Sequence, residues 1–242
     1  MKNTFTTVII SLAIIISVNI LGLAWKKSHQ THNSINVTGL ASRDFVSDLI
    51  VWSGSFQRKA MTTQEAFDKL KNDMETIKLY LIGKGVSEKE IVFSAVIINK
   101  EFEHIRNKNE SESDVFTGYN LTQRIEIESK NVDKIEKVSR EVTELIDKGV
   151  EFYSDAPRYY YTKLADLKIE MLASATKDAH TRAEKIAENA GGGIDHLTFA
   201  DMGIFQITGQ NSDEDYTWGG ALNTASKNKT ASITVKLEFS IN

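Results

Sequence analysis

Apolar side chains recur at helical spacing in three stretches of the chain. The first stretch begins at Thr62, whose spacing to Glu65 matches the capping box that opens many helices. The second stretch ends at Gly149, and the third spans about residues 165–190. The three apolar stripes consist of Ala66, Leu70, Met74, Ile77 and Leu81; Val132, Ile135, Val138, Val142, Leu145 and Ile146; and Leu172, Ala175, Ala179, Ala183, Ile186, Ala187 and Ala190.

Strand patterns lie between these predicted helices. Apolar and polar residues alternate over residues 116–128 and again over residues 230–241, as in half-buried antiparallel strands. A polar turn is predicted at residues 42–44. Further strands are predicted at residues 35–42, 45–58, 91–102, 150–154, 158–162 and 194–208. The order ββα-β-βα-ββα-ββ predicts an α+β fold of mostly antiparallel sheets, with three amphipathic helices packed on them.

The N-terminal part has a different pattern. After a short tail, residues 1–4, residues 5–25 form an apolar run, and residues 26–34 form a polar tether. A bilayer core needs a helix of about 20 mostly apolar residues, so we expect an uncleaved transmembrane signal-anchor. A cleaved signal peptide is the alternative, with residues 22–24 as its small-residue exit. Lys2 and the α-amino group nearly balance Lys26-Lys27, so flanking charge does not decide the orientation.

The remaining residues, 35–242, are enough for one large domain or two small ones. Residues 103–114 are charged and almost without apolar side chains, which predicts a surface loop. One alternative is therefore a body of two lobes divided near residues 103–115. A single proline argues against a linker-rich chain.

Charge and composition exclude some classes of function. The formal net charge of −4 argues against a protein that binds nucleic acid. The chain has no cysteine, so neither disulfides nor thiolate chemistry are available, and this fits either redox compartment.

No catalytic constellation is evident, and we expect no enzyme activity, no cofactor and no metal site. His29 and His32 have a metal-like spacing, but no further ligand lies near them in sequence. The glycines at 191–193 follow a predicted helix, which indicates a helix C-terminus instead of a phosphate loop. An acidic surface explains residues 213–215 better than a calcium loop does. His180 lies in mid-helix near Asp178, without a nucleophile motif.

The long polar loop of residues 209–228 is the best candidate for an interaction site. A tryptophan in such a loop, Trp218, either folds back onto the body or contacts a partner. Together with Tyr216, Asp213 and Asp215 it forms a candidate interaction loop. A small-molecule ligand is not identified by any motif.

Two regions resemble one known family. Residues 35–41 read INVTGLA, Arg43-Asp44 follow, and residues 48–52 read DLIVW, which resembles the opening strand of SIMPL-domain proteins. Residues 166–187 of the third helix, and its glycine exit at residues 191–194 into a strand, resemble the signature helix of that family. The resemblance runs from about residue 35 to residue 241 and is greatest for the bacterial branch with an N-terminal anchor.

The SIMPL domain is a domain of unknown function, and the resemblance implies no catalytic residue. It implies an exported, periplasmic or cell-surface protein, because the family includes proteins of these kinds. Some members are linked to oxidative-stress tolerance, and one assembles into a large hollow oligomer. We therefore expect a single-pass protein of the cytoplasmic (inner) membrane, anchored through residues 5–25, with its body in the periplasm or outside the cell. We expect this scaffold of the cell envelope to form a homo-oligomer to which the loop of residues 209–228 contributes. The alternative is an envelope protein that binds a small ligand, or a hydrolase.

Overall fold

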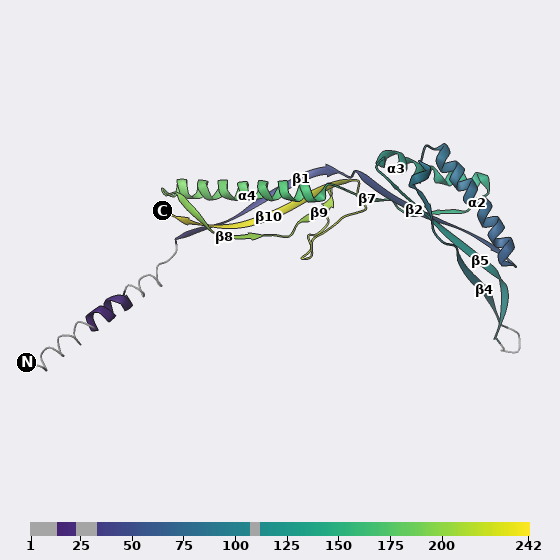
Figure 1. Ribbon diagram of the computed structural model, residues 1–242, viewed down its shortest axis with the longest axis horizontal. Helices are drawn as coiled ribbons and strands as arrows, with labels where there is room; N and C mark the ends of the chain where they lie inside the picture. Colours follow the sequence, from purple (N-terminus) through teal and green to yellow (C-terminus); the bar gives the residue numbers. More distant parts are fainter. Residues whose placement is uncertain (1–13, 23–32, 107–111) are drawn as a thin grey trace, which may run out of the picture. The chain divides into compact units, whose positions relative to one another are not determined.

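The computed structural model describes residues 14–22, 33–106 and 112–242. The chain forms two compact units, each assembled from separate stretches. The first unit contains the residues up to Gly39 together with Thr176–Met202 and Val235–Asn242, and the second contains Leu40–Ala175 and Gly203–Thr234. Three elements contribute residues to both units (Figure 1): β1 (Ser34–Val46), α4 (Leu164–Asn189) and β10 (Asn228–Ile241).

In the first unit, α4 packs on the antiparallel strand pair of β10 and β8 (Ile194–Met202). The imidazole of His180 on α4 meets the ring of Phe239 on β10 edge-on, with 5.5 Å between their centroids. The strands lie in the order β1-β10-β8. The buried side chains are Val37, Ala179, Ala183, Ala187, Val235, Leu237 and Phe239. Alanine allows a close approach of helix and sheet, as the pattern of the third stripe predicts.

Helix α4 ends as its sequence predicts. Gly191 has a φ of 82°, and its N–H donates to the carbonyl of Glu188, while the N–H of Gly192 donates to the carbonyl of Ala187. These two bonds form a Schellman motif, which satisfies carbonyls at the helix C-terminus. The glycines are therefore a helix cap. Within α4, Asp178 and Arg182 form an ion pair one turn apart, at 2.8 Å.

The second unit contains a six-stranded antiparallel sheet. The strand order is β3-β5-β2-β6, with β4 beside β5 and β7 beside β2. The strands are β2 (Leu49–Ala60), β3 (Ile91–Phe93), β4 (Ile97–Arg106), β5 (Glu112–Ser129), β6 (Phe152–Ser154) and β7 (Arg158–Tyr160). Helix α2 (Thr63–Gly83) contacts β2 and β5, and α3 (Val132–Glu141) contacts β2, so both cover one face of the sheet (Figure 1).

Both helices begin at polar caps. The hydroxyl of Thr62 accepts the N–H of Glu65 at 3.3 Å, and the side chain of Asn131 accepts the N–H of Lys134 at 3.3 Å. The predicted stripe of α2 lies in the core, with Met74 only partly buried. The second stripe needs one correction, because residues 142–148 form a 3₁₀-helix. Its three-residue period turns Ile146 outward, where the side chain is 66% exposed.

A glycine in β2 allows a close contact in the core of the second unit. An aromatic ring, that of Phe152 on β6, lies over Gly54, between the buried Trp52 and Phe56. A β-carbon at Gly54 would lie 2.3 Å from Cζ of Phe152 and 2.8 Å from the carbonyl oxygen of Tyr153. Only a residue without a β-carbon fits this position.

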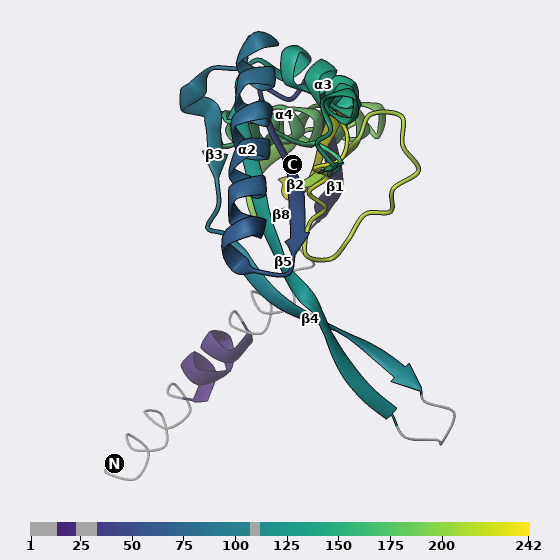
Figure 2. The ribbon, with the colours of Figure 1, turned by 90° about the vertical axis from the view of Figure 1, so that its right-hand side faces the viewer.

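The prediction of a surface loop at residues 103–114 is wrong at both of its ends. Strand β4 continues to Arg106 and β5 begins at Glu112, so residues 103–106 and 112–114 belong to a paired two-stranded ribbon (Figure 2). Residues 107–111 lie outside the described residues. Both faces of a ribbon can be polar, which removes the apolar alternation from its sequence. Cross-strand contacts replace that signal, as between His104 and Asp114. This ribbon lies within the second unit, so the two units do not separate near residues 103–115.

The predicted order of elements is correct for the helices and incomplete for the strands, which follow ββα-βββα-ββα-βββ. The predicted strand of residues 91–102 is divided after β3, and that of residues 194–208 is divided into β8 and β9 (Gln206–Gly209). The turn predicted at residues 42–44 is also wrong. Strand β1 continues to Val46 because Asp44 accepts hydrogen bonds from Thr230 and Gln210, at 2.6 and 2.9 Å.

Residues 14–22 are helical. Among the residues that the structure describes, no helix is long and apolar enough to cross a membrane. Most of the predicted anchor and tether, residues 5–13 and 23–32, lies outside the described residues.

Candidate functional site

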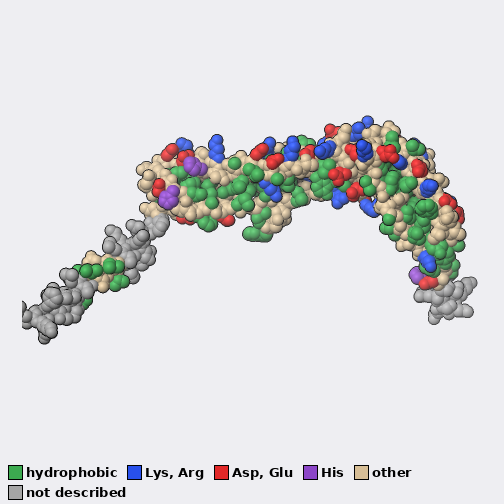
Figure 3. Space-filling model, in the orientation of Figure 1, with side chains coloured by type: hydrophobic (Ala, Val, Ile, Leu, Met, Phe, Trp, Pro, Cys, Tyr) green, Lys and Arg blue, Asp and Glu red, His purple; other side chains and the backbone are tan. Residues whose placement is uncertain are grey.

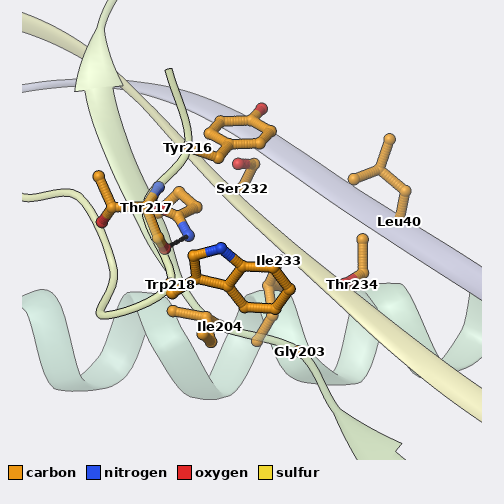
Figure 4. Close-up of a pocket in the computed structure, with 10 residues that line it drawn as sticks. Leu40, Gly203, Ile204, Tyr216, Thr217, Trp218, Ser232, Ile233 and Thr234 are labelled. Atoms are coloured by element: carbon orange, nitrogen blue, oxygen red, sulfur yellow. Dashed lines mark hydrogen bonds between the residues drawn. The ribbon is translucent and has the colours of Figure 1, made fainter. Parts of the chain in front are cut away.

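A pocket of about 470 Å³ lies in the second unit, beside the loop of residues 209–228. Figure 4 shows Trp218 and Ile204 on one side of the pocket and Tyr216 on the opposite side. Ser232 and Thr234 of β10 also line it, on the face opposite to Ala231. The lining is mainly apolar, with a few hydroxyl groups, which is typical of a binding site.

Trp218 does not fold back onto the body. Its side chain is 95% exposed, and that of Tyr216 is 67% exposed. In Figure 3 a hydrophobic protrusion lies where Figure 1 places this loop. Leu40, Ile204 and Leu222 are further exposed apolar residues. A cluster of this kind marks an interaction site more often than a single exposed apolar residue does.

The buried side chain of Gln206 holds the chain on both sides of Trp218. Its Nε2 donates to the carbonyl of Thr217 at 2.8 Å, shown as a dashed line in Figure 4. Its Oε1 accepts the N–H of Ala221 at 2.6 Å. The N–H of Gly220 closes the turn by donating to the carbonyl of Thr217 at 3.1 Å. The exposed indole is therefore carried by a fixed backbone.

A second buried group, Lys229, holds the base of the loop. Its side chain is 2% exposed, and Nζ donates to the backbone carbonyl and to Oδ1 of Asn223. Asn223 in turn donates to Glu214, which also accepts the N–H of Gly209 at 3.0 Å. Burial lowers the pKa of Lys229 to about 8, against the opposing effect of the Glu214 carboxylate.

This lowered pKa predicts a pH dependence of stability. Between about pH 8 and the ordinary lysine value of 10.5, the unfolded chain keeps a proton on Lys229 that the folded chain has lost. The free energy of unfolding therefore rises with pH through this window. We expect the rise in the full chain and not in a Lys229→Met variant, when urea unfolding is compared at several pH values from 7 to about 10.5. If the free energy of unfolding of the full chain, relative to that of the variant, stays constant or falls as the pH rises, the result would contradict the burial of the Lys229 amine.

The exposed part of the loop is acidic. Asp213 and Asp215 lie on the surface, and no basic side chain within the described residues is paired with either of them. The one lysine of the loop, Lys227, is paired elsewhere, with Asp133 and Glu136. The four residues of the predicted interaction loop are thus two exposed aromatics and two exposed carboxylates.

The other candidates from the sequence do not form a site with these residues. His29 and His32 lie outside the described residues. The side chain of His180 is half-exposed, and its ring contacts Phe239 and Glu184. Within the described ranges, no three side chains of the metal-binding types gather closely enough to hold an ion.

One cluster in the first unit has the residue types of a catalytic triad. Ser240 Oγ lies 3.0 Å from Nδ1 of His196, and Oδ2 of Asp195 lies 2.7 Å from the same nitrogen. A triad needs the carboxylate on one ring nitrogen and the nucleophile on the other. The cluster is also exposed to solvent, so its arrangement is that of a surface hydrogen-bond network.

In a second cavity of about 470 Å³, two carboxylates and one lysine of the lining already have partners. Among the residues that line it, Lys227 is bonded to Asp133, and both carboxylate oxygens of Asp48 accept bonds from Thr162 at 2.7 Å. The cavity beside Trp218 is therefore the better candidate for a binding site.

Gln206 and Lys229 are functional residues that were not predicted from the sequence. The sequence contains a signal for Lys229. In β10 every second residue points inward, as Ala231, Ile233 and Val235 do, and Lys229 lies at the next inward position. A lysine at an inward position of a strand indicates a buried amine with a polar partner. No comparable signal exists for Gln206, whose partners follow it by 11 and 15 residues.

Comparison with protein families extends the description beyond this chain. A family model described as SIMPL, a protein of unknown function (DUF541), matches residues 35–239. A comparison with curated proteins gives no match. Because the matched region covers most of the chain and both units, the chain belongs to the SIMPL (DUF541) family.

Proposed function

We propose that this chain is a membrane-anchored scaffold of the cell envelope that assembles with copies of itself and supports tolerance of oxidative or envelope stress. The observation that carries the assembly is the open edge of β8. This strand is nine residues long and pairs only with β10 among the described strands. All its residues after Ile194 are exposed.

Open strand edges are templates for pairing with another chain, and soluble proteins usually protect them with lysine, proline or short length. Strand β8 has no lysine and no proline, and its centre reads Leu-Thr-Phe-Ala. Leu197, Phe199 and Met202 are exposed on it. A second copy offers the same edge, and two such edges pair antiparallel about a two-fold axis. This supports self-assembly over a monomeric role.

The mass of the full chain tests this proposal. We expect light scattering in a mild detergent, after subtraction of the detergent, to give a multiple of the single-chain mass at tens of micromolar protein. Phe199→Lys places a charge on the edge and should shift the mass toward the single chain. Leu79→Lys changes an even more exposed apolar residue, on α2, and should leave the mass unchanged. A full chain that is already a monomer would overturn the proposal.

The anchor and its orientation are a second part of the proposal. They are supported by the apolar run at residues 5–25 and by the resemblance to exported proteins. A reporter fused after Asn242 should be active only outside the cytoplasm, and N-terminal sequencing should find the run uncleaved. A reporter that works only in the cytoplasm would contradict this orientation.

One observation favours a second candidate function. The pocket beside Trp218 has the size and the apolar lining of many small-molecule sites. A monomeric full chain that binds a small apolar ligand in this pocket would support the role of an envelope ligand-binding protein. The measurement is whether a small ligand stays bound to the chain through purification and is lost from the Trp218→Ala variant.

A further inference from the structure

We propose that the pocket beside Trp218 is a docking site for an extended protein segment that carries a lysine or arginine between apolar residues. The proposal goes beyond self-assembly, because its partner is a different chain. It stands on the exposure of Trp218, the fixed loop backbone and the two exposed carboxylates, Asp213 and Asp215, that precede Tyr216 in the same loop.

The exposure of Trp218 indicates a macromolecular partner. The indole forms part of the pocket wall, yet 95% of its side chain is accessible to solvent. A ligand contained in the pocket would leave most of the indole in water. Only a partner that continues beyond the pocket can cover both Trp218 and Tyr216.

The backbone of the loop is preorganised for binding in the absence of a partner. Gln206 fixes Thr217 and Ala221, on either side of Trp218, and Lys229 fixes Asn223. Binding to a fixed loop does not require the ordering of its backbone, which removes part of the entropic cost of association. Tryptophan is also the residue type most enriched among those that dominate binding energy.

Charge decides among the three available partners. A second copy would bring its own Asp213 and Asp215 against the same carboxylates if the two loops met, and like charges repel. An anionic lipid surface attracts basic segments, so it also disfavours this loop. A basic protein segment is attracted to the two carboxylates.

The pocket also matches such a segment in its apolar chemistry. Ile204 and Leu40 offer contacts for aliphatic side chains. The faces of Trp218 and Tyr216 can receive a guanidinium or ammonium group through a cation–π interaction. Ser232 and Thr234 add hydroxyl groups at the strand side of the pocket.

Titration of the full chain in detergent with a dye-labelled peptide, Ala-Leu-Arg-Leu-Ala with blocked ends, tests the proposal. We expect it to bind about tenfold more tightly than the peptide with glutamate in place of arginine. The difference should shrink between about 0.05 M and about 0.5 M salt, because the carboxylates are exposed and screened. A peptide with norleucine at the central position reports the apolar contribution alone.

Three variants assign the binding to this pocket. Trp218→Ala should weaken binding of the arginine peptide by about tenfold or more. The double substitution Asp213→Asn with Asp215→Asn should weaken binding of the arginine peptide about threefold and leave the affinity of the norleucine peptide unchanged. Ile169→Ala, at an exposed apolar residue of α4 in the same unit, is the matched control and should bind as the unaltered chain does.

The outcomes separate this proposal from self-assembly. Trp218→Ala should leave the mass of the assembly unchanged, and Phe199→Lys should still bind the arginine peptide. A fall in mass with Trp218→Ala would show that the loop of residues 209–228 contacts a second copy, which is the role expected from the sequence, and would overturn the inference. Equal binding of the arginine and glutamate peptides would overturn it as well.

Discussion

Phe239→Ala is expected to lower the free energy of unfolding by about 3–5 kcal/mol. The side chain of Phe239 is 5% exposed and lies on the same face of β10 as Val235 and Leu237. Its ring is contacted by His180 of α4 at 5.5 Å, so the substitution leaves a cavity between helix and sheet. Urea unfolding of the full chain, followed by circular dichroism, measures the loss.

Phe67→Ala is the matched control for this prediction. Phe67 lies on α2, and its side chain is 45% exposed. Alanine also has the higher helix propensity, so we expect a loss below about 1 kcal/mol. Similar losses for the two substitutions would mean that burial of Phe239 is not the source of its contribution.

Gly54→Val should cost about 3 kcal/mol, near the upper end for a side chain inserted into a filled core. The ring of Phe152 can move aside from the new β-carbon, but the carbonyl of Tyr153 cannot move without disturbing β6. That strand pairs with β2 at Gly54, Ser55 and Phe56. Thermal unfolding should show the loss, and the near-ultraviolet signal of the nearby Trp52 should change with it.

Ser55→Val tests whether valine itself is the cause. Ser55 is the next residue of β2, and its side chain is only partly buried on the opposite face. Valine favours strands, so we expect a change within about 1 kcal/mol. If Gly54→Val leaves the stability unchanged, β6 can move to accommodate the new side chain, and the contact between Gly54 and Phe152 is not tight.

The sequence predicted those elements whose signal is local. Three such elements are the alanine-rich apolar stripe of α4, the glycine cap of that helix and the alternation of β5. Each depends only on residues within one or two helical turns or along one strand. One error, the turn predicted at residues 42–44, lies where a polar stretch finds its partners far away in the chain. Asp44 continues β1 because Gln210 and Thr230 bond to it, more than 160 residues later.

The candidate site shows the same division. Trp218 could be selected from the sequence because tryptophan is rare in polar loops, and the structure finds it exposed. The pocket could not be predicted, because β1, β10 and the segment after β8 contribute its remaining lining. The supporting bonds of Gln206 depend on the path of the loop, which its polar composition does not specify.

The interleaving of the two units has a consequence for the order of events during synthesis. The sheet formed by β2 to β7 is complete once Tyr160 has emerged, because all of its strands precede that residue. The first unit begins near the start of the described body, but β10 supplies its central strand, and Ile241 donates to the carbonyl of Asn33. The six-stranded sheet can therefore form on the nascent chain before β10, the partner strand of β1, has been synthesised. Any factor that receives the emerging chain meets β1 without its partner strand until β10 arrives.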